Sequence, residues 1–372
     1  MAAAITVDSL DLSFRNETVL RDVDLTVEEG EFCVIMGPSG SGKSMLLKSI
    51  VGLETPDSGD VFLNGENASR LSVADRDVGF VFQEFEETLF PHRSVGENIA
   101  FGLERQGVDA DEIERRTDEM LELLAIAHTK DDAPPELSGG QQQRVELARQ
   151  LVRRCDTMLL DDPLADLDYK LQKRMEIEMR RIHADLESAF VYVTHNQDQA
   201  LKLADKLVIL NGGRVEQIGT PSEVYHQPAS AFVARFAGDS NAFKTTVTGT
   251  TGDAVRLDTD VGEMLATPMH GSGVDATGIA TVRPENVAIG EDAADADNTF
   301  EATPAGSTYM GEETEMAVEI PGLSRQLLAT EPGQRTLPDS ETVLVGWNAA
   351  DTQFFEKLSV TDTVQIDDLL EI

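Results

Sequence analysis

Cysteine, lysine and long apolar runs are all scarce in this 372-residue sequence, and each scarcity excludes something. Two cysteines, Cys33 and Cys155, are too few for a disulfide-rich secreted domain, and we expect two buried thiols in a reducing cytosol. No apolar stretch approaches the roughly 20 residues that a membrane-spanning helix needs. The first residues lack a basic segment followed by an apolar run, so we expect no signal peptide. Any work at a membrane would then be done through a partner.

Basic residues are scarce as well, because 68 acidic residues face only 30 basic ones, of which nine are lysine. The net charge of −38 is spread over the chain, with 24 acidic and 6 basic residues from Ser240 onward and 44 and 24 before it. This charge argues against nucleic-acid binding, which needs a basic patch. Acidic surfaces keep a protein hydrated in concentrated salt, where screening removes most of the self-repulsion. We therefore expect a cytosolic protein from an extreme halophile.

Strand and helix patterns alternate through the first part of the chain. Residues 1–35 alternate in polarity as strands do, and apolar runs at 32–36, 78–82, 157–160 and 189–193 are typical of buried strands. Helices are expected near 44–52, 110–127, 140–153 and 170–187. Strands that alternate with helices predict an α/β fold with a mostly parallel sheet covered on both faces.

The pattern changes after Asp239, where short strands are separated by Gly, Pro and Asp. Such a pattern predicts a small all-β barrel. We therefore expect two domains, residues 1–238 and 239–372, with the boundary close to 236–241.

A glycine-rich loop follows the first buried run. Residues 37–44 read GPSGSGKS and match the phosphate-binding pattern G-x-x-x-x-G-K-[ST]. The loop consists of Gly37, Pro38, Ser39, Gly40, Ser41, Gly42, Lys43 and Ser44. Its glycines let successive N–H groups face the phosphates, and the helix that follows adds its N-terminal dipole. Lys43 is placed to reach the β- and γ-phosphates and Ser44 to ligate Mg²⁺. An ordinary Gly/Ser turn is the alternative interpretation.

Three further segments carry a family resemblance. Residues 137–144 read LSGGQQQR at the start of a helix, an apolar strand ends at Asp161, and another ends at His195. In this order and spacing, together with the phosphate-binding loop, they resemble the ATP-binding-cassette (ABC) ATPase family over residues 4–239. The resemblance implies a P-loop NTPase (RecA-like) core with antiparallel β and helical subdomains, which binds and hydrolyses Mg-ATP.

The resemblance also implies roles around the nucleotide. Phe14 would stack on adenine, although a core aromatic at a strand end is the alternative. Gln83 would contact Mg²⁺ and sense the γ-phosphate, with a loop amide as its alternative, and Asp161 would hold Mg²⁺ through water. Ser44, Gln83 and Asp161 are thus the implied metal ligands. His195 would lie beside the γ-phosphate, unless it is a structural histidine.

The five-residue signature is implied to act across a dimer. Ser138, Gly139, Gly140 and Gln141 would press on the γ-phosphate held by the opposite subunit through a hydroxyl, N–H groups and a helix N-terminus. An ordinary helix cap is the alternative. Asp168 would belong to the loop that crosses the dimer interface. Because each ATP site then needs two subunits, we expect ATP to close a dimer and hydrolysis to open it.

Three departures from the family pattern bear on activity. Asp162 stands where the family has the catalytic glutamate, so the carboxylate that positions the attacking water is one methylene shorter. A misplacement of about 1 Å can cost about 100-fold in rate. The segment 84–90, which in the family docks the membrane subunit, is two residues longer than usual and carries three glutamates. Ala165 and Asp166 replace the common Ser-Ala and place a charge near the dimer interface.

The linker at 214–243 resembles that of importer ATPases of the maltose and polyamine type, in which a C-terminal barrel similar to oligonucleotide/oligosaccharide-binding (OB) folds follows. Residues 281–285 and 309–313 look like pieces of that barrel. The resemblance implies a second ATPase subunit, transmembrane permease subunits and, indirectly, an extracellular solute-binding protein, at the cytoplasmic face of the membrane. A low-turnover regulatory subunit, because of Asp162, and a soluble ABC ATPase outside transport stay open as alternatives.

The acidic surface generates the first prediction. The midpoint of thermal unfolding should rise between low salt and molar KCl, because salt screens the repulsion among the carboxylates. Circular dichroism of one preparation across a salt series measures it. A midpoint that stays constant or falls would contradict the halophilic interpretation.

Overall fold

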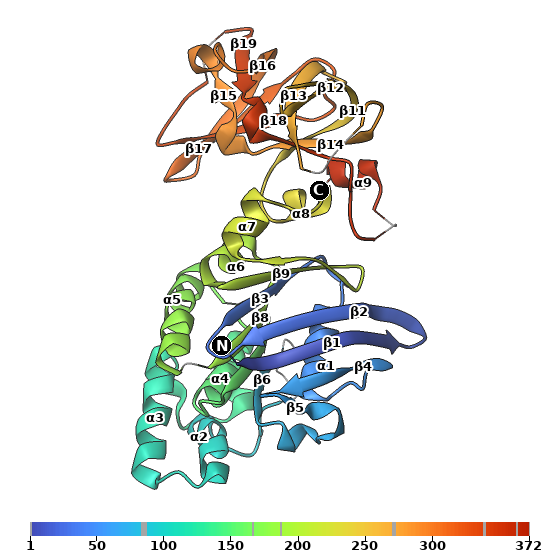
Figure 1. Cartoon of the computed structure of the whole chain (residues 1–372). Coiled ribbons are helices and arrows are strands. Elements are labelled where there is room, and N and C mark those ends of the chain that lie inside the picture. The colour runs from blue at the N-terminus through green and yellow to red at the C-terminus, as the bar shows by residue number, and fades with distance from the viewer. Residues whose placement is uncertain are drawn as a thin grey trace. The chain divides into compact units, whose positions relative to one another are not determined.

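The computed structural model describes residues 2–82, 88–165, 167–186, 188–269, 273–337, 340–361 and 364–371. They form two compact units, residues 1–221 and 222–372 (Figure 1). None of the helices in these described ranges is both long and apolar enough to cross a membrane. Cys33 and Cys155 are free and buried, which confirms the expectation of two buried thiols.

A six-stranded sheet forms the centre of the first unit. Its order is β10-β9-β3-β8-β7-β6, and the strands from β9 to β6 run parallel, while β10 pairs antiparallel with β9 at the edge. The strands are β3 (Phe32–Met36), β6 (Val78–Val81), β7 (Thr157–Asp161), β8 (Ala189–Val193), β9 (Lys206–Asn211) and β10 (Arg214–Gly219). Every residue of β3, β7 and β8 is buried, as the uninterrupted apolar runs predict.

A second, antiparallel sheet has the order β2-β1-β4-β5. Its strands are β1 (Ala3–Phe14), β2 (Glu17–Glu28), β4 (Ser58–Leu63) and β5 (Glu66–Asn67). Alternation places Val23, Leu25 and Val27 inside, where they share one core with Leu46 and Ile50 of helix α1 (Lys43–Val51). The helix that carries Lys43 is thus held by apolar contacts with both sheets.

Helices α2, α3 and α4 pack against one another and form the expected helical subdomain. The remaining helices of the first unit are bounded as follows: α2 (Val95–Gln106), α3 (Ala110–Leu123), α4 (Gly139–Leu151), α5 (Tyr169–Leu186) and α6 (Gln197–Leu203). Helix α2 was not predicted from the sequence. Its signal was present, because Ser94 and Glu97 form a reciprocal capping box at its start.

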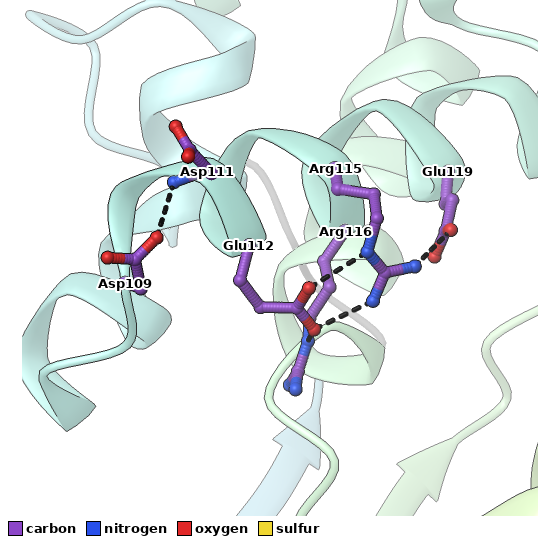
Figure 2. Close-up of polar contacts among 6 residues, drawn as sticks. All are labelled: Asp109, Asp111, Glu112, Arg115, Arg116 and Glu119. Atoms are coloured by element: carbon purple, nitrogen blue, oxygen red, sulfur yellow. Dashed lines mark hydrogen bonds and ion pairs between the residues drawn. The ribbon is translucent and has the colours of Figure 1, made fainter.

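The surface of α3 shows how acidic side chains are arranged with the few arginines (Figure 2). Asp109 accepts a hydrogen bond from the N–H of Asp111 at 3.0 Å and caps the helix. Hydrogen bonds from Arg115 and Arg116 lower the pKa of Glu112 to about 2. Arg115 also pairs with Glu119 one turn further on. Because these pairs are exposed, each contributes little to stability by itself.

The second unit is mainly β structure, as predicted. Strands β11 (Asn241–Thr251), β12 (Ala254–Thr259), β13 (Gly262–Pro268), β20 (Thr352–Phe355) and β14 (Thr277–Val282) close into a barrel. A five-stranded sheet of order β15-β19-β16-β17-β18 comprises β15 (Ala288–Ile289), β19 (Val343–Trp347), β16 (Asn298–Tyr309), β17 (Glu313–Glu319) and β18 (Leu327–Pro332). The core of this unit includes Trp347, stacked with Phe243 and Phe300.

The second unit also includes three short helices: α7 (Pro221–His226), α8 (Ala231–Phe236) and α9 (Ile366–Glu371). The predicted boundary at 238/239 lies just before β11, whereas the compact unit begins at residue 222. Arg283 explains the difference. Its guanidinium donates to the carbonyls of Gly238, Asp239 and Tyr225 at 2.6, 3.0 and 3.3 Å and lies over the Tyr225 ring. The linker is therefore fastened to the barrel.

The Arg283 contacts generate the second prediction. Arg283→Lys should lower the free energy of unfolding of the second unit by about 2 kcal/mol, because lysine keeps the charge but cannot donate to three carbonyls in a planar fork. Trp347, the single tryptophan, reports on this unit alone by its fluorescence during urea unfolding.

Arg256→Lys is the matched control in the same unit. Arg256 is exposed and pairs with Glu263 at 2.7 Å, so its replacement should cost less than about 0.5 kcal/mol. An equal loss in the two variants would contradict the role given to Arg283.

Candidate active site

The phosphate-binding loop joins β3 to α1 and is shaped by close backbone packing. A side chain at Gly37 would place its Cβ 2.0 Å from the carbonyl oxygen of Leu210. Gly42 has φ 101°, a left-handed conformation that favours glycine. Lys43 Nζ donates to the carbonyls of Gly37 and Pro38 at 2.8 and 2.9 Å, so the lysine lies folded along the loop.

A cavity of about 330 Å³ opens beside this loop. It is lined by Val19, Ser39, Gly40, Gly42, Lys43, Ser44, Met45, Asp161, Asp162, Val193, Thr194 and His195. The lining brings together the loop and the residues that follow β7 and β8, which are far apart in sequence. Burial lowers the pKa of Lys43, while the carboxylates of Asp161 and Asp162 act in the opposite direction.

Asp161 ends β7 and lies against the start of α1. The Ser44 hydroxyl donates to its Oδ1 at 3.1 Å. Burial raises the pKa of Asp161 and the charge of Asp162 raises it further, while the Ser44 hydrogen bond lowers it. A hydroxyl and a carboxylate at this distance suit a hard cation such as Mg²⁺, which prefers oxygen ligands and usually takes few from the protein.

Asp162 and His195 are in direct contact, which the sequence did not indicate. The distance from His195 Nδ1 to Asp162 Oδ2 is 2.7 Å. An ionised carboxylate only accepts, so a hydrogen bond between these two atoms needs the hydrogen on Nδ1 of the ring. The Asp162 side chain is 11% exposed, whereas the His195 side chain is 71% exposed. The pair joins a buried carboxylate to a ring at the open side.

Gln199, which was not predicted from the sequence, stabilises the turn that carries His195 by hydrogen bonds. Gln199 Oε1 accepts hydrogen bonds from the hydroxyls of Tyr192 and Thr194 at 3.1 and 3.0 Å. Thr194 Oγ1 in turn accepts from the N–H of Asn196 at 3.1 Å. The only signal in the sequence was the polar run after an apolar strand, which does not single out Gln199.

The signature residues lie apart from this cavity in the described part of the chain. Ser138 and Gly139 are exposed at the start of α4, and Gly140 and Gln141 are half-buried. The Ser138 hydroxyl donates to Gln141 Oε1 at 2.9 Å, and a Cβ on Gly139 would meet nothing within 4 Å. An exposed motif of this kind can act on a nucleotide held by another subunit.

Three other predicted site residues, Phe14, Asp168 and Gln83, are not among the described residues that line the cavity. Phe14 ends β1, is 42% exposed and has the Arg15 guanidinium 5.2 Å from its ring centroid, and it is not among the residues that line the cavity in the described structure. Asp168 accepts from the N–H of Leu171 at 3.0 Å at the start of α5. Gln83 lies outside the described residues, as do Glu84, Glu86 and Asp166.

Comparison with known proteins decides the family. The profile described as ABC transporter matches residues 20–165, and that described as TOBE domain matches residues 280–355. The chain is 39% identical over 355 residues to the spermidine/putrescine import ATP-binding protein PotA of Thermobifida fusca, covering 94% of this chain and 87% of that one. This chain belongs to the ABC transporter family.

Further relatives support the same assignment. The maltose/maltodextrin import ATP-binding protein MalK of Photorhabdus laumondii subsp. laumondii is 36% identical over 348 residues, which cover 92% of this chain and 93% of that protein. A solved dimer of the ATP-binding cassette MJ0796, in a post-hydrolysis state with ADP and phosphate, is 30% identical. It matches 58% of this chain and 98% of its own, with a TM-score of 0.54. The ABC ATPase core and the C-terminal β domain predicted from sequence are thereby confirmed.

Membership of the ABC family identifies ATP as the nucleotide that the chain binds and hydrolyses. ABC ATPases bind and hydrolyse ATP, and the cavity is lined by the loop that matches the phosphate-binding pattern, including Lys43. Asp162 and His195 lie in the same lining. A carboxylate can accept a proton from an attacking water, and a neutral ring nitrogen can accept another hydrogen bond.

The Asp162–His195 pair generates the third prediction. Asp162→Asn should lower the turnover number for ATP by at least about 100-fold, because the amide can still accept from His195 but no longer carries the charge that a base needs. Asp162→Glu should keep or raise turnover, because it restores the longer reach. Steady-state ATPase assays in saturating Mg-ATP and molar KCl measure both.

Binding of ATP provides the control for these two variants. The Kd for ATP should change less than about threefold in either, since phosphate contacts come from the loop. If Asp162→Asn turns over ATP as fast as the wild type, Asp162 is not the catalytic carboxylate.

Proposed function

We propose that this chain is the ATPase subunit of an ABC importer and works as a dimer around two Mg-ATP molecules. The observation that carries the proposal is the division of the site. The phosphate loop, Asp161, Asp162 and His195 line one cavity, while Ser138 to Gln141 are presented on an exposed helix start. Two copies, each supplying a cavity and a signature, would complete two sites. ATP would then close the dimer, and hydrolysis would open it.

Within each site we assign Ser44 and Asp161 to Mg²⁺, together with Gln83. A Mg²⁺ ion held there would neutralise charge on the phosphates. In the described residues, groups of three or more His, Cys, Asp or Glu side chains that could hold a metal are absent, which suits an ion bound largely by phosphate and water. Lys43 and the loop N–H groups orient the phosphates, Asp162 orients the attacking water, and His195 holds the Asp162 carboxylate. Phe14 would stack on adenine after Arg15 leaves its ring.

The partners that we propose are transmembrane permease subunits and, through them, an extracellular solute-binding protein, with this chain at the cytoplasmic face of the membrane. Two relatives, matched over 87% and 93% of their length, are import ATP-binding proteins, one for spermidine/putrescine and one for maltose/maltodextrin. A polyamine or a sugar is therefore the class of cargo that we propose. We also propose that residues 1–238 are the ATPase domain and 239–372 the C-terminal β domain.

The division of the site generates the fourth prediction. In the Asp162→Asn background, Mg-ATP should shift the chain from monomer to dimer, because ATP is bound and not hydrolysed. Sedimentation velocity in molar KCl with and without Mg-ATP measures the shift. Adding Ser138→Arg should abolish the dimer and leave the Kd for ATP within about threefold, because a bulky cation replaces the small signature hydroxyl at the partner's site.

Lys43→Ala is the comparison for this experiment. It should abolish both ATP binding and the dimer, because the lysine that reaches the phosphates is removed. Dimers that form equally well in all three variants, or without ATP, would contradict nucleotide-driven closure. Wild-type protein that binds Mg-ATP without hydrolysing it would contradict the ATPase itself.

A further inference from the structure

A buried acidic side chain lies in the middle of the signature helix, away from the cavity. Glu146 of α4 is 0% exposed, and its carboxylate forms an ion pair with Arg149, one turn later. Burial raises the pKa of Glu146, and the charge of Arg149 acts against that shift. A carboxylate buried to this degree is costly unless all its acceptor sites are used. The other polar contacts of the Glu146 carboxylate must therefore offset the cost of its burial.

The second partner of Glu146 comes from the segment that follows β6. The Thr88 hydroxyl donates to Glu146 Oε2 at 3.0 Å, and Arg149 Nη1 donates to the Thr88 carbonyl at 2.7 Å. Gln150 Nε2 donates to Glu146 Oε1 at 3.2 Å. Both the side chain and the backbone of Thr88 are thus bound to one turn of α4. Hydrogen bonds to charged groups are among the stronger ones.

The same segment is fixed to α2 two residues later. Asn98, fully buried, accepts from the N–H of Phe90 at 2.8 Å and donates to its carbonyl at 3.1 Å. The Phe90 ring packs edge-on against the Phe101 ring with centroids 4.7 Å apart. The Arg149 guanidinium lies 5.5 Å from the centroid of the Phe90 ring. Residues 88–90 therefore connect α2 to α4, and we call this segment, together with Glu146 and Arg149, the joint. Arg149 contacts both Thr88 and Phe90.

We propose that Thr88, Glu146 and Arg149 are positioning residues that set where the signature helix lies, and thereby the rate of ATP hydrolysis. Glu146 follows Gly139 by seven residues, which is about 10 Å along a rigid helix, so a shift at the joint moves the signature with it. The inference rests on the proposed function, because the signature acts on ATP held by the second subunit. A movement of about 1 Å at a catalytic group can change a rate by about 100-fold.

Thr88→Val tests the contribution of the Thr88 hydroxyl to the joint. Valine keeps the volume and branching of threonine and the backbone carbonyl, and it removes only the hydroxyl that donates to Glu146. The turnover number in molar KCl should fall about tenfold, while the Kd for ATP stays within twofold. Thr88→Ser restores the hydroxyl and should return turnover to within about twofold of wild type.

Thr314→Val is the matched control. Its buried hydroxyl donates to the Gly333 carbonyl at 2.7 Å and accepts from the N–H of Arg335 at 3.0 Å in the second unit, so valine removes two hydrogen bonds of similar length far along the chain. Turnover in this variant should equal that of wild type. A Thr88→Val protein that turns over ATP like wild type would overturn the proposal. So would one whose Kd for ATP rises as much as its turnover falls, since that indicates general loss of structure.

Amide hydrogen exchange tests the role of the joint independently of the proposed ATPase activity. In Thr88→Val the amides of Arg144 to Leu147 should exchange about tenfold faster, while those of α5 keep their rates. This readout requires no turnover, so it still decides the joint if the wild type fails to hydrolyse ATP. Unchanged exchange in α4 would overturn the joint even if turnover fell.

Discussion

Three adjacent parallel strands reach the same level at Ile35, Val193 and Asp161, and the whole site depends on that register. Beyond this level β3 continues through Met36 into the phosphate loop, while β7 and β8 continue into Asp162 and His195. Hydrogen bonds carry the register past the strand ends, because the N–H of Asp162 donates to the Val193 carbonyl at 3.0 Å. A shift of one residue in any strand would turn its site residues to the other face of the sheet.

The backbone at Asp162 supplies a physical reason for the shorter carboxylate. Its φ is 47°, in the left-handed region, where aspartate is enriched and longer side chains are less frequent. The short side chain nevertheless reaches His195, which extends from the neighbouring strand end. Two effects therefore oppose each other at this position. A glutamate gains reach toward the water but fits this conformation less well.

Local patterns in the sequence were sufficient to locate the central strands and the loop that we assign to phosphate binding. Uninterrupted apolar runs located β3, β7 and β8, and the loop pattern located Lys43 and Ser44, because these features follow from one short stretch each. The Asp162–His195 contact and the joint at Thr88 could not be predicted in this way. They connect positions 33 and 58 residues apart through packing that no single stretch determines. The capping box of Ser94 and Glu97 was a local signal for α2 that was overlooked.

Several of the few basic residues are buried arginines that connect separate elements of the fold. Arg149 and Arg283 are buried and donate to backbone carbonyls at the junctions of elements, and Arg235 does the same between α8 and the carbonyl of Leu369. A guanidinium offers five donors in a fixed geometry, which suits such junctions better than lysine. Salt screens exposed charges far more than buried ones. Concentrated salt would therefore weaken repulsion across the acidic surface while leaving these internal contacts intact.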